Sequence, residues 1–248
     1  MNHKANMTMM PKKGFTLIEL MLAMTFISIL LLTIALTIVQ IANIYNKGII
    51  TKEVNASSRA ISDELNLAMR SSGSITLANK YVQSNWGGRL CIGQYSYVWN
   101  YGKALANQDV SRNQYSGPAP SGNTVITGGV TRYEISLVKV PDAGGAYCVP
   151  NGGGVYPKIN PTGAVELLRT GDHGLVLHSM TVTSLASGTD ALSAQQLYKV
   201  SYTIGTADIN ALNTDQTLCK GPDQPGSDLN YCAVEQFTIV LRVVSGVN

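Results

Sequence analysis

The chain has 248 residues, enough for one substantial domain with an appendage and too few for two large cores. Charged residues make up 13% of it, against about 25% in an average protein. The formal net charge of +3 equals the charge of Lys4, Lys12 and Lys13 in the first 14 residues, so the rest of the chain is formally neutral. Bulk charge therefore gives no support to nucleic-acid binding, which needs clustered cations.

A long uncharged segment covers residues 20–46, and it consists largely of Leu, Ile, Ala, Met and Val. About 20 apolar residues cross the hydrocarbon core of a bilayer as a helix, so this segment is long enough to span one with tilt. Because the lysines precede it, the positive-inside rule places residues 1–14 in the cytoplasm and the rest outside. The lipid bilayer is the first partner that the sequence predicts.

A single acid, Glu19, stands at the head of this segment. An acid near the hydrocarbon costs about 2.5–3.5 kcal/mol on insertion scales, so some interaction must offset that cost. An ordinary secretory signal has a shorter apolar region followed by a small-residue cleavage site, and no such site is apparent after residue 46. A processing signal is therefore expected before the apolar run.

Residues 12–20 read KKGFTLIEL and resemble the class III signal of type IV prepilins and type II secretion pseudopilins. The resemblance implies cleavage after Gly14 by a prepilin peptidase and methylation of the new terminal amine on Phe15. It also implies that Glu19 neutralises the N-terminal ammonium of a neighbouring subunit in a filament. An acid in a low-dielectric bundle is tolerable when it is paired with a cation. The alternative is that Glu19 merely sits at the headgroup interface.

The apolar helix lacks the mid-membrane proline of many major pilins, because no proline occurs from Phe15 to Gly117. Gly48 is then the softest point of the predicted helix, since glycine is less favourable than alanine by roughly 1 kcal/mol in a helix interior. Any melting on assembly is expected there or in the β-branched run before it.

Residues 49–72 continue the helix in an amphipathic pattern. Apolar residues recur at spacings of three, four and seven, and charged residues occupy the other faces. Arg70 falls in the last turn and Gly73 follows as the C′ residue, so we expect one helix from Phe15 to about Ser72. The apolar positions are Ile50, Val54, Ile61, Leu65, Ala68 and Met69.

After Gly73 the pattern changes to strands rich in Tyr, Val, Ile and Thr, separated by turn-rich stretches. We expect an α+β, pilin-like fold in which the long helix packs on one face of an antiparallel sheet. In the last strand, Phe237, Ile239, Leu241 and Val243 share one face. The expected strands are 75–82, 89–101, 125–140, 164–169, 174–185, 196–204 and 233–244.

The expected organisation has four parts. They are a basic leader peptide at 1–14, a transmembrane or filament-core helix at 15–46, an amphipathic helix continuing into the head at 47–73, and a β-rich globular head with a C-terminal disulfide loop at 74–248.

Four cysteines, Cys91, Cys148, Cys219 and Cys232, follow the membrane segment. Outside a membrane an even count indicates disulfides, and four cysteines permit three pairings. We prefer Cys219 with Cys232, which closes a polar loop rich in Pro and Gly, and Cys91 with Cys148 as the remainder. Many pilins close a C-terminal loop in this way. Zinc is the rival interpretation, but no two cysteines have the usual C-x₂₋₄-C spacing.

The sequence contains no H-E-x-x-H, G-x-S-x-G or P-loop motif. Asp172, His173 and His178 suggest a metal site, but histidines five residues apart on a strand point to opposite faces, so ordinary surface or interface histidines are preferred. Asp223 and Asp228 in the polar loop do not have the spacing of a calcium loop. We expect no enzyme activity, cofactor or metal.

Tyr95, Tyr97, Trp99 and Tyr101 alternate along one expected strand. Such a stripe forms either an exposed adhesive or sugar-stacking surface or the covered face of a sheet beneath a helix. We prefer the covered face.

The sequence therefore predicts a non-enzymatic minor type IV pilin, similar in size to a large minor pilin of the PilW kind or to the J-type minor pseudopilin. Its expected partners are other pilins, the prepilin peptidase and the inner-membrane assembly platform. It would begin as a single-pass inner-membrane precursor and end in an extracellular pilus or a periplasmic pseudopilus. Glu19 argues against the tip-most subunit type, which lacks this acid. The alternatives are a type II secretion pseudopilin and an adhesive, DNA-binding or surface-binding head displayed on a pilus. A membrane-anchored enzyme has no supporting residues.

Overall fold

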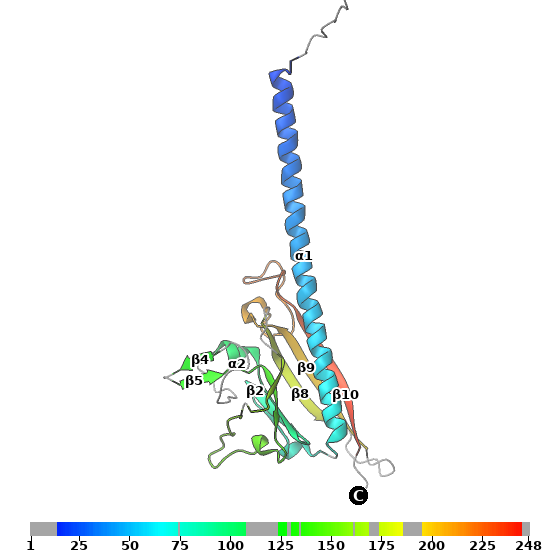
Figure 1. The fold of residues 1–248 in the computed structure, drawn as a ribbon, viewed down its shortest axis with the longest axis vertical. Helices are drawn as coiled ribbons and strands as arrows, with labels where there is room; N and C mark the ends of the chain where they lie inside the picture. Colours follow the sequence, from blue (N-terminus) through cyan, green and yellow to red (C-terminus); the bar gives the residue numbers. More distant parts are fainter. Residues whose placement is uncertain are drawn as a thin grey trace, which may run out of the picture. The chain divides into compact units, whose positions relative to one another are not determined.

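The computed structural model describes residues 14–73, 75–107, 124–127, 130–133, 135–160, 162–168, 174–185 and 195–244. The chain divides into two compact units, of which the first ends at Tyr45 and the second begins at Asn46. The second unit contains the β-rich head (Figure 1). Each unit is considered by itself below.

Helix α1 (Leu17–Ser71) is unbroken over 55 residues and passes through Gly48 without interruption. Among the described residues it is the helix long and apolar enough to cross a membrane. It ends where Gly73 adopts a φ of 69°, a left-handed conformation that glycine takes without steric cost. The predicted helix boundaries are therefore correct to within two residues at the start and one at the end.

The described part of the head contains two larger antiparallel sheets and a separate hairpin. The first sheet has the order β1 (Tyr81–Gln83), β2 (Gly87–Ile92), β3 (Tyr95–Asn100), β6 (Leu137–Pro141) and β7 (Val165–Leu168). The second has the order β10 (Val234–Val244), β9 (Gln195–Thr206) and β8 (Leu175–Ser184). The hairpin pairs β4 (Thr124–Thr127) with β5 (Val130–Tyr133), and a short helix, α2 (Gly102–Ala106), follows β3. This is the α+β arrangement that the sequence predicts.

Three of the expected strands are longer than the strands in the structure. Residues 89–101 form a hairpin, because Gly93 takes a φ of 57° and the chain turns between β2 and β3. Residues 75–82 begin with a 3₁₀ turn at Leu77–Asn79, and only the last two belong to β1. Residues 125–140 contain parts of three strands rather than one.

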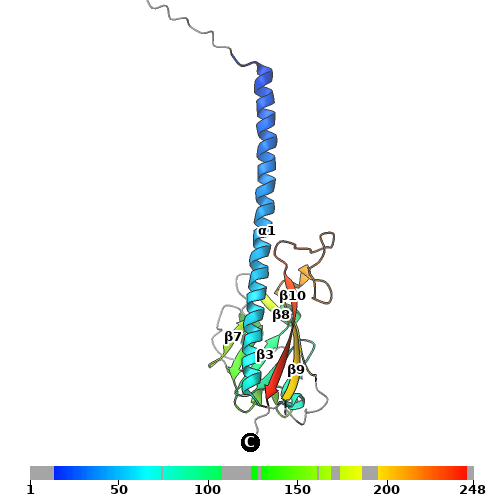
Figure 2. The same cartoon turned by 90° about the vertical axis from the view of Figure 1, so that its right-hand side faces the viewer.

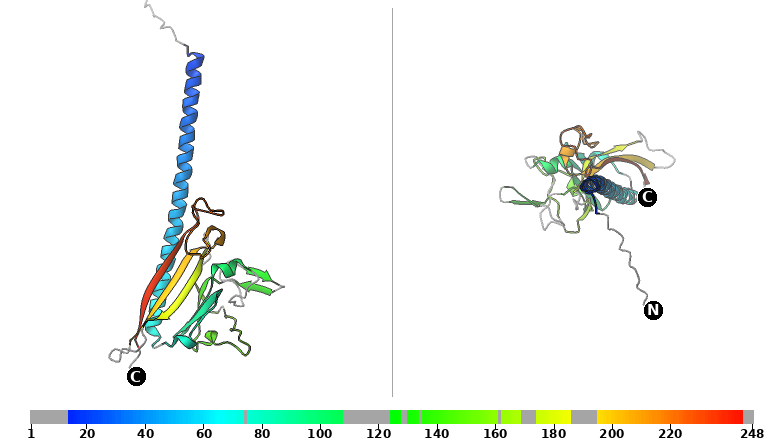
Figure 3. Two further views of the ribbon diagram at one scale, coloured as in Figure 1. Left: turned by 180° about the vertical axis from the view of Figure 1, so that it is seen from behind. Right: turned by 90° about the horizontal axis from the view of Figure 1, so that it is seen from above.

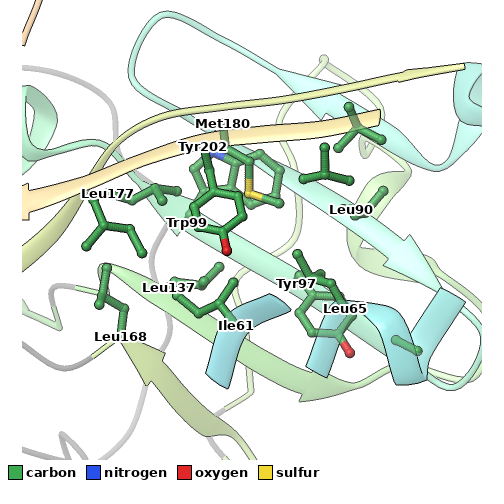
Figure 4. Close-up of a cluster of buried hydrophobic side chains, with 14 of the residues drawn as sticks. Ile61, Leu65, Leu90, Tyr97, Trp99, Leu137, Leu168, Leu177, Met180 and Tyr202 are labelled. Carbon is green, nitrogen blue, oxygen red and sulfur yellow. The ribbon is translucent and has the colours of Figure 1, made fainter. Parts of the chain in front are cut away.

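The main hydrophobic core lies between the second half of α1 and both larger sheets. Figures 2 and 3 show β9 and β10 alongside this part of the helix. Figure 4 shows Ile61 and Leu65 of α1 near Tyr97 and Trp99 of β3. All four side chains are at most 1% exposed. Burial of apolar side chains is the main favourable term in folding, so this contact anchors the helix in the head.

The aromatic stripe is covered, as preferred from the sequence. Tyr97, Trp99 and Tyr101 are buried in the main core, and Tyr95 is 39% exposed. An adhesive surface made of this stripe is therefore wrong for three of its four members.

The first sheet is covered on both faces, although one covered face was expected. Val98, Val138 and Val140 point away from α1 and form a second core with Ile135 and Ile159. A segment at 142–160 lies over this second face. The Arg89 guanidinium donates to two backbone carbonyls of that segment at 2.8 and 2.9 Å, and the Cys91–Cys148 disulfide ties the segment to β2.

A buried tyrosine also links α1 to the second sheet. The Tyr202 hydroxyl on β9 donates to the Ser58 carbonyl oxygen at 3.0 Å. It also lies 3.0 Å from Ser58 Oγ and 2.6 Å from Ser62 Oγ. One hydroxyl thus joins a turn of the helix to the middle of a strand.

Replacing this hydroxyl tests the link. Tyr202→Phe is expected to lower the free energy of unfolding by about 1–3 kcal/mol, because the groups that bonded to the hydroxyl stay buried and cannot bond to water instead. Unfolding of the full chain by denaturant in detergent micelles measures the change. Tyr231→Phe is the control, since that side chain is half exposed. Equal stability of the two variants would contradict the assignment.

Candidate assembly site at the start of the helix

Helix α1 begins with a reciprocal pair of hydrogen bonds between Thr16 and Glu19. The Glu19 backbone N–H donates to Thr16 Oγ1 at 3.3 Å, and the Thr16 backbone N–H donates to Glu19 Oε2 at 3.0 Å. The Thr16 hydroxyl donates to the same carboxylate oxygen at 2.9 Å. This arrangement is a capping box, in which two otherwise unpaired helix N–H groups are satisfied.

The capping box fixes where the carboxylate lies. A negative charge in the first turn is also favoured by the helix dipole. Both bonds from Thr16 go to Oε2, while an ionised carboxylate has about four acceptor sites on its two oxygens. Glu19 is therefore held in place by its own chain and keeps the capacity to accept from a cation.

Thr16 was not singled out in the sequence, although the signal was present. Residues 16–19 read TLIE, which is the S/T-x-x-E signature of a capping box before an apolar run. The same Glu19 thus has a local role that the resemblance did not suggest.

Gly14 and Phe15 precede the first helical residue, Leu17. Both are exposed, and a Cβ added to Gly14 would meet no atom within 4 Å. The peptide bond between them is therefore open on all sides in the described chain. Residues 1–13 of the predicted leader lie outside the described residues.

The first unit has an apolar surface. Large apolar side chains before Tyr45 are exposed throughout, from Phe15 at 86% just before α1 and Leu17 at 77% at its start. The hydroxyl groups in this stretch donate to carbonyl oxygens three or four residues back, at 2.8–2.9 Å. Their polar hydrogens are thus satisfied within the helix, and the surface needs lipid or other helices to cover it. The hydroxyl residues are Thr25, Ser28, Thr33 and Thr37.

In the head, the cysteines form the two disulfides Cys91–Cys148 and Cys219–Cys232, the pairing preferred from the sequence. All four cysteines are used, so the zinc interpretation is wrong. The described residues contain no group of three or more His, Cys, Asp or Glu that could hold a metal ion.

The C-terminal disulfide loop is organised by its own polar contacts. Asp228 Oδ1 accepts from the backbone N–H groups of Asn230 and Tyr231 at 3.1 Å. The Tyr231 hydroxyl in turn lies 3.1 Å from the Asn46 side-chain amide on α1. Asp228 therefore acts as a turn cap, and Asp223 is exposed at the loop surface.

The two candidate histidines have different outcomes. His173 lies outside the described residues. His178 is on β8 and only 5% exposed, so the expectation of a surface histidine is wrong for it. Its Nε2 is 3.1 Å from the Thr206 carbonyl oxygen.

A charged contact joins α1 to the first sheet. Glu64 Oε1 lies 2.6 Å from Lys139 Nζ and accepts from the Tyr97 hydroxyl at 2.7 Å. Burial acts to raise the pKa of Glu64, but hydrogen bonds from Lys139 and Tyr97 and the charge of Lys139 outweigh it and hold the pKa below its ordinary value of 4.5. Lys139 Nζ also lies 3.9 Å from the centre of the Tyr95 ring.

Residues 9–39 match the family model described as the prokaryotic N-terminal methylation motif. The matched segment contains Gly14, Phe15, Thr16 and Glu19. No curated protein and no solved structure matches the chain.

The methylation motif and the capped apolar helix fit a protein with a class III signal, and the α+β head fits a pilin-like fold. The match confirms the resemblance found in the sequence, and it supports a type IV pilin or pseudopilin. That family is structural, and its members associate with other pilins and are processed by a prepilin peptidase. The signal and the apolar helix fit an inner-membrane-anchored precursor.

Thr16→Val tests the capping box. The substitution keeps the branched shape and removes the hydroxyl, and losing an N-cap costs about 1 kcal/mol. Amide hydrogen exchange at Glu19 and Leu20 is then expected to accelerate roughly fivefold. Nuclear magnetic resonance of the full chain in micelles measures it. Thr25→Val, whose hydroxyl bonds only within the helix, should leave these two amides unchanged. Identical exchange in both variants would refute the cap.

The Glu64 contact predicts a pH dependence of stability. Because the folded-state pKa of Glu64 lies below 4.5, its contribution is fully present above that pH and is lost as the pH falls through the folded pKa. Glu64→Gln should flatten the fall in unfolding free energy between about pH 5 and pH 3. Glu235→Gln on β10 is the matched control. Parallel pH profiles for wild type and Glu64→Gln would exclude this contribution.

Proposed function

We propose that the chain is a minor type IV pilin, a structural subunit that joins a pilus through residues 15–46 after removal of its leader. The observation that carries the proposal is the methylation motif with Glu19 fixed at the first helical turn. The exposed apolar surface before Tyr45 supports it, because that surface fits both a bilayer before assembly and other helices afterwards.

Processing is proposed after Gly14, with methylation of Phe15. Residues 14–16 are not helical, so the chain is available in the extended form that a peptidase active site generally requires. Cleavage would create an ammonium group on Phe15, four residues before Glu19. The leader at 1–14 would stay in the cytoplasm because of its lysines.

Assembly is proposed to use Glu19 as the partner of a neighbouring subunit's terminal ammonium. The capping box holds the carboxylate at the helix start before any neighbour arrives, which lowers the ordering cost of pairing. Within an apolar helix bundle the pair offsets the cost of each buried charge. The inner-membrane assembly platform and other pilins are the proposed partners, and the pilus outside the cell is the proposed final location.

A type II secretion pseudopilin is the second candidate. The same motif supports it, because pseudopilins share the class III signal. The two candidates differ in where the mature chain is found, in extracellular filaments or in the periplasm.

Two substitutions separate the charge of Glu19 from its capping role. Glu19→Gln keeps a side-chain oxygen for the cap and removes the charge, whereas Thr16→Val keeps the charge and removes the cap hydroxyl. We expect all forms to be cleaved after Gly14. Incorporation into filaments should fall at least tenfold for Glu19→Gln, which corresponds to roughly 1.4 kcal/mol, and much less for Thr16→Val.

The measurement is N-terminal mass spectrometry of sheared surface filaments and of membranes, with quantities normalised to the total protein. A mature chain starting at methylated Phe15 in filaments supports the pilin. The same mature chain confined to the periplasmic side of the envelope supports the pseudopilin. An intact Met1 in membranes, indifferent to Glu19→Gln, would refute both.

A further inference from the structure

A polar cleft of about 380 Å³ lies on the head, beside the turn that precedes Cys219. Its size is at the lower end of the range of small-molecule sites, about 300–1,000 Å³. Buried Tyr101 and His178 are among its lining residues, and α2 and the first half of β8 contribute to it. Figure 1 labels both elements. The remaining lining residues are Gln83, Ser84, Asn85, Lys103, Ser179, Thr214, Asp215 and Gln216.

His178 is closely packed in the lining of the cleft. A Cβ at Gly102 would lie 2.8 Å from Val176 Cγ2 and 3.1 Å from His178 Nδ1. A Cβ at Gly205 would lie 2.5 Å from Val234 Cγ2, 2.6 Å from the Ala233 carbonyl oxygen and 3.1 Å from His178 Nε2. Glycine at both positions therefore lets the chain pack closely around the imidazole and the side chains next to it. The Thr206 carbonyl accepts only, so Nε2 donates to it. Burial lowers the pKa of His178, which favours the neutral ring with Nδ1 as its acceptor nitrogen.

One wall of the cleft contains a backbone conformation that its residue does not favour. Gln216 has a φ of 55°, the only positive φ of a non-glycine residue in the described part of the chain. Its N–H donates to the Asn213 carbonyl at 3.0 Å, and Asn213 Oδ1 accepts from the N–H of Thr217 at 2.9 Å. Glycine would fit this turn with less strain. A glutamine held here places a side-chain amide in the cleft wall.

Lys103 is the single cation among the residues that line the cleft. Lys103 Nζ lies 5.5 Å from the centre of the Trp86 ring and 6.0 Å from that of Tyr101, within cation–π range. The ammonium is balanced within the lining by Asp215. This charge balance disfavours phosphates and nucleic acids, which need a net positive site.

The chemistry of the lining selects a neutral polyhydroxylated ligand. Three side-chain amides, four hydroxyls including that of Tyr101, one carboxylate and one ammonium supply both donors and acceptors around a small volume. We propose that this cleft binds one neutral saccharide unit, a hexose or an N-acetylhexosamine of a surface glycan. The proposal goes beyond the structural role and does not depend on it.

Two variants and a control test the site in the full chain held in detergent micelles. Asp215→Asn removes the carboxylate, and Gln216→Gly removes the amide while suiting the turn. Asp223→Asn is the matched control, because Asp223 is exposed on the C-terminal loop outside the cleft. The probes are the methyl glycosides of glucose, galactose, mannose, N-acetylglucosamine and N-acetylgalactosamine. Saturation-transfer nuclear magnetic resonance detects binding, and titration gives Kd.

At least one glycoside should bind, with Kd at least tenfold weaker for Asp215→Asn and for Gln216→Gly and unchanged for Asp223→Asn. Thermal unfolding of Gln216→Gly should occur at or above the wild-type temperature, which separates lost binding from lost folding. Three results overturn the proposal. They are the absence of saturation transfer from all five probes at millimolar concentration, equal affinity in all variants, and competition by a short DNA duplex or a sulfated oligosaccharide stronger than by any neutral sugar.

Discussion

The exposed apolar surface of α1 before Tyr45 is the constraint on which the interpretation of this protein depends. A helix that is hydrophobic on all sides requires an apolar environment, and its backbone hydrogen bonds and back-bonded hydroxyls make it compatible with one. Glu19 is the exception in that surface. Its capping box with Thr16 satisfies part of the carboxylate within the chain, and in the proposed assembly a neighbouring cation offsets the remaining electrostatic cost.

The second half of α1 meets the opposite requirement, because it must be held by the head. Apolar burial supplies most of the attraction, and it is not directional. Two polar contacts fix the position of the helix relative to the sheets. Glu64 with Lys139 and Tyr97 fixes the helix against the first sheet, and Tyr202 with Ser58 fixes it against the second. A helix bound to two sheets by separate directional contacts has little freedom to rotate or slide within the head.

The sequence was sufficient where local patterns decide the structure. Heptad-like spacing and Gly73 gave the helix end, and the loop argument gave the Cys219–Cys232 pair. Sequence patterns were insufficient where contacts with residues distant in the chain decide the structure. The turn at Gly93 interrupts a run that reads as one strand, and β6 is buried on both faces because segment 142–160 covers the side away from α1. The alternation of apolar and polar residues along a strand cannot reveal that a segment from elsewhere in the chain covers the second face of the sheet.

The proposed saccharide cleft illustrates the same limit at a candidate site. Its residues come from the end of β1 and the turn after it, the start of α2, the first half of β8 and the turn before Cys219, and no local motif unites them. Among the cleft residues, only Gln216 is unusual by itself, because its backbone is left-handed where glycine is the ordinary choice. Conflicts between local preference and observed structure concentrate at functional sites. The left-handed backbone at Gln216 lies in the wall of a cleft that also contains the buried His178 and one side chain of each charge, and this combination supports the proposed binding site.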